Sequence, residues 1–100
     1  MLSASGSSSE VVVIAPAEVD ICTAPILSDM LDRARAVHPE RVIVDFGSTT
    51  FSDTTAVEIL LSTATRLSQH GCELQIRSPD RFLRRIATVL GLSDRLGISA

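Results

Sequence analysis

The sequence predicts a single α/β domain built on a small, mostly parallel sheet. Three apolar runs rich in β-branched or alternating residues alternate along the chain with three segments of helical periodicity, and the connections between them are short. This order favours parallel strands joined by right-handed helical crossovers. The length of 100 residues fits one such domain with one modest core.

The first strand is expected over residues 11–16, where the run VVVIAP ends in a proline. Residues 1–10 (MLSASGSSSE) are rich in serine and poor in apolar side chains, so we expect a disordered tail before a domain that spans residues 11–100. A helix is expected next over residues 23–37, with Thr23 as its N-cap. Its apolar stripe consists of Ile26, Leu27, Met30, Leu31, Ala34 and Val37.

The second strand, expected over residues 41–46, is apolar on both faces, which is typical of a central strand. A second helix follows over residues 54–69, and Gly71 is free to end it in the left-handed conformation. The third strand, residues 72–78, alternates apolar and polar side chains, so one of its faces should be exposed to water.

The third helix is expected over residues 80–90, followed by a short helical turn near the C-terminus. Its apolar side chains are Phe82, Leu83, Ile86, Val89 and Leu90. Because these apolar side chains should occupy the buried side of the helix, we expect Arg81, Arg84 and Arg85 to face solvent.

Composition argues against several classes of function. The net charge is -3 and Trp and Tyr are absent, which disfavours a nucleic-acid binder. No apolar run approaches the length of a membrane span, and no secretion signal precedes the first strand. Cys22 and Cys72 match no metal-site spacing and are expected to be reduced thiols. We therefore expect a cytoplasmic protein, without cofactor or metal.

Hydroxyl and acidic side chains crowd the junction between the second strand and the second helix. They are Ser48, Thr49, Thr50, Ser52, Asp53, Thr54 and Thr55. A helix N-cap needs one such residue, so capping by Asp53 or Thr54 leaves a surplus. A phosphate on a hydroxyl at this helix start would meet free N–H groups and the positive end of the helix dipole. The cluster therefore suits a site where charge is added and removed.

Catalytic patterns are weak in this sequence. His38 and His70 each follow a helical segment, and no serine or cysteine is placed to form a triad with them. Asp45, Asp53 and Glu58 could in principle gather a divalent cation, but carboxylates at a strand end and a helix start more often cap than ligate. We expect no enzymatic activity and no catalytic residues.

The order of motifs resembles the STAS domain of bacterial anti-sigma factor antagonists. In that family an apolar strand ends in Asp, and a short loop leads to Asp-Ser-Ser/Thr-Gly-Leu-Gly and an apolar helix. Here the strand ends at Asp45 and residues 53–58 read DTTAVE. The earlier family motif Gly-Glu-Leu-Asp is matched by AEVD at residues 17–20, and a late Gly-Leu by residues 91–92. The resemblance covers residues 11–96 and implies helices packed mainly on one side of the sheet.

The resemblance also implies a function. The family's phosphoacceptor directly follows the Asp, which places it on Thr54, with Thr55 as the second choice. The expected partner is an anti-sigma factor of the serine/threonine kinase type, bound by a monomer or weak dimer. The docking surface would include Asp20, Asp45, Asp53, Thr54, Thr55 and Glu58. The two motif glycines are replaced here by Ala56 and Glu58.

Two other interpretations stay open at this point. The first is a STAS scaffold subunit of a transporter or signalling complex that is never phosphorylated, which the replaced glycines favour. The second is a small enzyme or nucleotide-binding domain that uses Asp45 and Asp53. The absence of a glycine-rich phosphate loop argues against the second.

Overall fold

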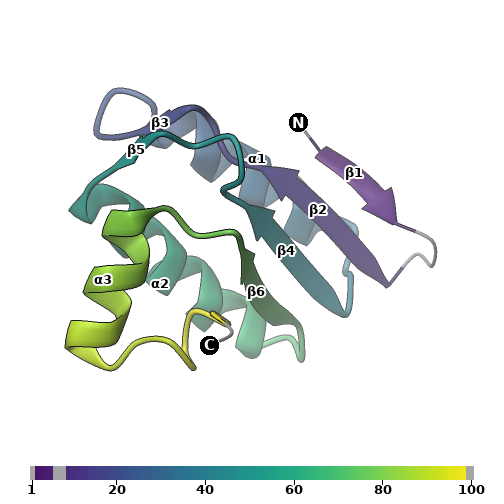
Figure 1. Cartoon of the computed structure of the whole chain (residues 1–100). Helices are drawn as coiled ribbons and strands as arrows, with labels where there is room; N and C mark the ends of the chain where they lie inside the picture. Colours follow the sequence, from purple (N-terminus) through teal and green to yellow (C-terminus); the bar gives the residue numbers. More distant parts are fainter. Residues whose placement is uncertain (1, 6–8, 99–100) are drawn as a thin grey trace.

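The main sheet has four strands in the order β1-β2-β4-β6 (Figure 1). The computed structural model describes residues 2–5, as backbone, and residues 9–98. The strands are β1 (Leu2–Ser5), β2 (Glu10–Ile14), β4 (Arg41–Asp45) and β6 (Glu73–Arg77). β2, β4 and β6 run parallel to their neighbours, and β1 pairs antiparallel with β2 at one edge. This confirms the mostly parallel sheet.

The helices are α1 (Ala24–Ala36), α2 (Thr54–Ser68) and α3 (Arg81–Leu90). α1 and α2 lie side by side on one face of the sheet, and α3 lies near β5, which confirms helices mainly on one side (Figure 1). The side chains that every second strand position sends toward α1 and α2 form the core. They include Val11, Val13, Val42, Val44, Leu74 and Ile76. None of the described helices has both the length and the apolar character needed to cross a membrane.

A second, two-stranded parallel sheet was not predicted. It pairs β3 (Glu18–Val19) with β5 (Phe51–Ser52). The inner pair of side chains, Val19 and Ser52, is buried, whereas Glu18 and Phe51 point outward side by side. This small sheet joins the segment after β2 to the segment before α2, so these two segments are neighbours.

The disordered tail predicted for residues 1–10 is wrong for Leu2–Ser5 and for Glu10. Leu2–Ser5 is a strand whose register with β2 runs from Leu2 opposite Val13 to Ser5 opposite Glu10. Ser9 is tied in as well, because its carbonyl accepts hydrogen bonds from the amides of Glu40 and Arg41 at 2.8 and 3.0 Å. Composition indicated disorder because backbone pairing with an existing strand leaves little trace in side chains. Residues 1 and 6–8 lie outside the described part of the chain.

The predicted apolar stripes extend too far at the helix ends. Ile26 and Val37 of the first stripe are exposed, and so are Val89 and Leu90 of the third helix. Arg81, Arg84 and Arg85 are exposed as predicted, and Gly71 has the left-handed φ of 71° expected of it.

The C-terminal segment closes the free edge of β6. Residues 93–97 form hydrogen-bonded turns, among them the helical-turn bond from the amide of Leu96 to the carbonyl of Leu92 at 2.9 Å, in line with the predicted short helical turn. The carbonyl of Gly97 then accepts a hydrogen bond from the amide of Ile76 at 3.0 Å. Ile98 forms a parallel bridge with Ile76, and Leu96 is fully buried beside it. The segment therefore belongs to the core.

Candidate functional site

The small β3–β5 sheet sets the positions of two aspartates that the sequence singled out. Asp20 directly follows β3 and Asp53 directly follows β5, and the amide of Asp53 donates to the carbonyl of Val19 at 3.2 Å. The paired strands thus bring the start of α1 and the start of α2 together at one corner of the domain, as Figure 1 shows.

Asp20 organises the loop before α1. One of its carboxylate oxygens accepts hydrogen bonds from the amides of Cys22 and Thr23 at 2.9 and 3.1 Å. The hydroxyl of Thr23 donates to the carbonyl of Glu18 at 2.7 Å and caps no amide of its own helix. Thr23 is thus the N-cap residue of α1, as predicted, but its side chain caps no helix amide because its hydroxyl is committed to the carbonyl of Glu18.

Asp53 is the N-cap of α2, and its carboxylate accepts a hydrogen bond from the amide of Thr55 at 2.9 Å. Thr54, the first residue of the helix, is exposed, whereas Thr55 is half-buried. Within the described residues no hydrogen bond engages the Thr54 hydroxyl. The acceptor position implied by the resemblance thus carries an accessible hydroxyl at a helix start.

The hydroxyls of Thr49 and Thr50, also in the cluster, have structural roles. Thr49 donates to the carbonyl of Pro16 at 2.7 Å, and Thr50 donates to the carbonyl of Ala17 at 3.2 Å. Both bonds hold the loop before β5 against the segment that leads into β3. These contacts explain much of the hydroxyl surplus as loop fixation, and they leave Thr54 as the exposed hydroxyl directly after the cap.

Ser52 links the site to the third helix. Its buried hydroxyl lies 2.9 and 2.8 Å from the two carboxylate oxygens of Asp80, the N-cap residue of α3. Asp80 makes no side-chain cap to its own helix, so its carboxylate is committed to Ser52. Sequence reasoning missed this pair, because 28 positions separate the two residues and each alone is a routine turn residue.

Two exposed apolar side chains flank this corner and were also missed. Ile21, beside Asp20, is 79% exposed, and Phe51, beside Ser52, is 48% exposed. Isolated apolar residues in loops carry no signal by themselves. Only the pairing of β3 with β5 places them on the same side of the domain as Thr54. We call the surface formed by Glu18, Asp20, Ile21, Phe51, Asp53 and Thr54 the docking corner.

Of the other predicted partner-binding residues, Thr55 is half-buried beside Thr54, whereas Asp45 and Glu58 lie apart from that corner or at its border. Asp45 ends β4, where its carboxylate accepts a hydrogen bond from the amide of Gly47 at 2.7 Å. No described contact joins Asp45 to Asp53 or Thr54. Glu58 is exposed one helical turn after Thr54 and lines a groove of about 290 Å³ between α1 and α2.

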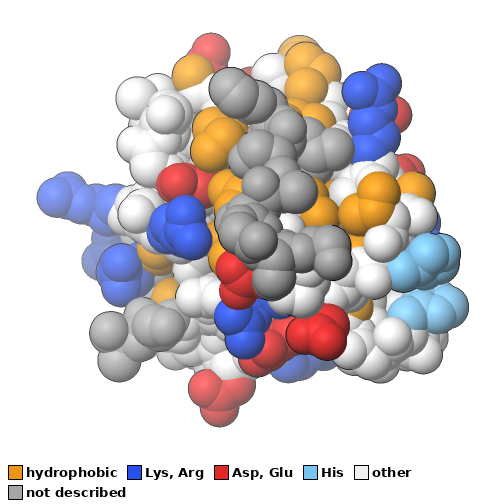
Figure 2. Space-filling model, turned by 90° about the vertical axis from the view of Figure 1, so that its right-hand side faces the viewer, with side chains coloured by type: hydrophobic (Ala, Val, Ile, Leu, Met, Phe, Trp, Pro, Cys, Tyr) orange, Lys and Arg blue, Asp and Glu red, His pale blue; other side chains and the backbone are white. Residues whose placement is uncertain are grey.

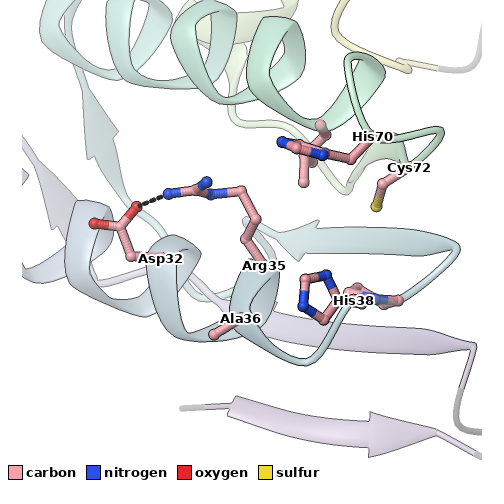
Figure 3. Close-up of a pocket in the computed structure, with 8 residues that line it drawn as sticks. Asp32, Arg35, Ala36, His38, His70 and Cys72 are labelled. Carbon is pink, nitrogen blue, oxygen red and sulfur yellow. Dashed lines mark hydrogen bonds and ion pairs between the residues drawn. The ribbon is translucent and has the colours of Figure 1, made fainter.

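A second hollow, of about 230 Å³, lies at the other end of the sheet (Figure 3). It is bordered by His38 and His70, which follow α1 and α2, and by the buried Cys72. The two histidines lie side by side on the surface in Figure 2. Among residues 2–5 and 9–98, however, no three His, Cys, Asp or Glu side chains are arranged to hold a metal ion. This hollow is far from Thr54, because it lies where β4 and β6 begin.

The two thiols should differ sharply in reactivity. Cys22 is exposed, whereas Cys72 is buried, and desolvation raises the pKa of its thiol. We therefore expect a disulfide reagent such as 5,5′-dithiobis(2-nitrobenzoate) at pH 8 to titrate one thiol quickly in the folded protein, and the second only after denaturant is added. Cys22→Ser should remove the fast thiol and leave the slow one. Two fast thiols in the folded wild type would contradict the burial of Cys72.

Comparison with known proteins adds family and fold. A family model described as "Mlab, STAS domain" matches residues 2–98. The Bacillus cell fate determinant SpoIIAA in its phosphorylated form superposes with a TM-score of 0.75 at 18% identity, covering 94% of this chain and 85% of that chain. The anti-sigma factor antagonist SpoIIAA in its unphosphorylated form gives 0.77 at 18% identity, covering 94% and 82%.

A third similar structure is that of the protein TM1081, with a TM-score of 0.74 at 13% identity over 96% of this chain and 78% of that chain. At these identities the likeness concerns the fold. No curated protein sequence matches the chain.

Proposed function

The chain belongs to the STAS domain family, and from that premise we propose that it is an anti-sigma factor antagonist switched by phosphorylation on Thr54. In this proposal the unphosphorylated protein binds an anti-sigma factor of the serine/threonine kinase type and thereby releases a sigma factor for transcription. The same partner then phosphorylates Thr54 and the complex weakens. The chain is a binding module and a substrate, with no catalysis of its own.

The observation that carries the proposal is the environment of Thr54. Its exposed hydroxyl is free of intramolecular hydrogen bonds within the described residues, whereas Thr49, Thr50 and Ser52 use theirs to hold the fold. A kinase can reach this hydroxyl without opening the domain. The cap of α2 is made by Asp53, so modification of Thr54 leaves the helix start intact.

A phosphate at this position would change the surface while preserving the fold. It would lie at the N-terminus of α2, where free amides and the helix dipole favour an anion. It would also add a charge of about -1.5 to -2 beside Asp53, in a corner that already carries Asp20 and Glu18. A partner surface complementary to the unmodified corner would then face a strongly negative one. Thr55 is the second choice for the acceptor, but it is half-buried.

The remaining features of the proposal follow from the same surface. Ile21 and Phe51 offer apolar contact area beside the acidic groups, a mixture common in protein interfaces. We propose that the protein acts in the cytoplasm, as a monomer or weak dimer, without binding nucleic acid or membrane.

The test is phosphate transfer. The chain is incubated with ATP and, one at a time, with the purified kinase-type anti-sigma factors of the same genome, and the product is mapped by mass spectrometry. One phosphate on Thr54 is expected, and none on the Thr54→Ala variant. A phosphate found solely on Thr55 would move the acceptor by one position. If partners bind the chain but none of them transfers phosphate to it, the switch is refuted.

A specific feature favours the scaffold interpretation as the alternative. Glu58 is exposed one turn after Thr54 and places a permanent negative charge near the acceptor, where the family motif has glycine. A scaffold subunit of a transporter or signalling complex would tolerate that charge, since it never has to distinguish a modified from an unmodified surface. Undiminished partner binding by a Thr54→Glu variant, together with no phosphate transfer, would favour this alternative.

A further inference from the structure

The outward face of α3 carries three arginines without partners in the described structure. Arg81, Arg84 and Arg85 are all exposed, and none of them makes an ion pair or side-chain hydrogen bond within residues 2–5 and 9–98. Their spacing of three and four residues puts them on one side of the helix. The arginines of α1 differ, because Arg33 and Arg35 each lie within 3.2 Å of an aspartate.

Apolar surface accompanies this charge. Together with Thr88 and Val89 the three arginines line an open hollow of about 490 Å³. Val89 is 71% exposed and Leu90 is 58% exposed, although both are apolar. Arginine is enriched in protein interfaces relative to the rest of the surface, and the exposed apolar side chains beside it add area that a partner could cover.

A buried hydrogen bond links the start of α3, which carries the arginine face, to the docking corner. The buried Ser52 hydroxyl binds both carboxylate oxygens of Asp80, the residue directly before Arg81. Ser52 is also two positions before Thr54. The start of α3 and the start of α2 are therefore held at the same corner, as Figure 1 shows, and a partner that covers Thr54 can also reach the first turn of α3.

We propose that Arg81, Arg84, Arg85 and Val89 form a second contact for the same anti-sigma factor and bind a carboxylate-rich segment of it. This inference rests on the proposed function and adds the chemistry of the partner. The partner's surface is basic or neutral where it covers the acidic docking corner, and acidic where it covers α3. Guanidinium groups pair with carboxylates in a fixed two-pronged geometry, which also orients the partner.

The chain itself argues against two other occupants of the α3 face. Insertion into a membrane needs a free apolar helix face, but Leu83 and Ala87 of α3 are fully buried in the domain. Nucleic acid would be repelled by the net charge of -3, and the chain has no Trp or Tyr for stacking.

The test compares two variants that lose the same charge. The first replaces Arg81, Arg84 and Arg85 with Gln. The control replaces Arg33, Arg35 and Arg95 with Gln, away from the docking corner. Affinity for the anti-sigma factor that phosphorylates the chain is measured at low and high salt. We expect the first variant to bind about 10-fold more weakly or worse, with a smaller salt dependence, and the control to stay within about threefold of wild type.

The outcomes separate the inference from the proposed function. If the wild type binds an anti-sigma factor and the two variants bind it with equal affinity, the inference is overturned and the proposed function stands. No anti-sigma factor bound by the wild type would instead refute the proposed function. Circular dichroism should show both variants folded. Binding of wild type to phosphatidylglycerol vesicles or duplex DNA, lost in the α3 variant, would overturn the assignment to an acidic protein segment.

Discussion

Thr54→Glu should weaken binding to the cognate anti-sigma factor by about 10-fold or more, because it places a fixed negative charge at the centre of the docking corner. The side chain it replaces is exposed and makes no hydrogen bond within the described residues, so the change costs the fold little. A carboxylate carries less charge and fewer acceptor oxygens than a phosphate, so the effect should be smaller than that of modification itself. Isothermal titration calorimetry with the unmodified partner measures it.

Two matched variants isolate the charge in this experiment. Thr54→Gln has nearly the same shape as Thr54→Glu without the charge, and it should bind within about threefold of wild type. Thr54→Ala should also bind, and its free energy of unfolding should change by about 0.5 kcal/mol or less, since Asp53 provides the cap. Equal affinity of the Glu and Gln variants would show that charge at Thr54 does not govern docking.

Gly97→Ala should destabilise the domain by about 3 kcal/mol, the largest stability effect we expect from removing a glycine. Gly97 has a φ of 64°, and a Cβ there would overlap the carbonyl oxygen of Leu74 in β6. The backbone cannot move away without breaking the hydrogen bond from Ile76 and exposing the fully buried Leu96. Urea unfolding monitored by circular dichroism gives the free energy directly.

Gly91→Ala is the matched control. Gly91 has a nearly identical φ of 67°, but a Cβ there would meet nothing within 4 Å. Gly91→Ala should therefore lower the free energy of unfolding only by the cost of a left-handed backbone at a non-glycine residue, about 1 kcal/mol. The difference between the two variants therefore measures the close approach of the C-terminal segment to β6. If both variants lose the same stability, the packing of Gly97 against β6 contributes nothing.

The regular part of this fold could be predicted from sequence because its signals are local. Helical periodicity over 15 residues of α2 and the alternation in β6 are properties of consecutive side chains. The buried run of β4, Val42 to Val44, is equally explicit. Right-handed crossovers then fix the order of the parallel strands.

The elements that could not be predicted from sequence form by pairing between segments that are distant in the chain. The two strands of the β3–β5 sheet have two residues each, which is too short to leave a periodic pattern. β1 is recognised through its backbone bonds to β2, while its composition resembles a linker.

The candidate site was likewise predictable only where its residues are close together in the sequence. Thr54 and Asp53 adjoin one another in sequence, so their relation as exposed hydroxyl and helix cap could be inferred. The partners of Thr49 and Ser52 lie 33 and 28 positions away. Without those contacts the hydroxyls of the cluster look equivalent, although they differ in exposure and in hydrogen bonding.

The edge strand β1 has a further consequence, for the behaviour of the protein when many copies are present. The β2 segment Val-Val-Val-Ile has the composition that adds readily to a strand of another molecule when its edge is open. Four residues, Leu-Ser-Ala-Ser, occupy that edge, and two serines among them make a poor template for the next copy. We therefore expect that β1, a strand with little side-chain content of its own, limits the pairing of the apolar β2 segment with other copies of the chain.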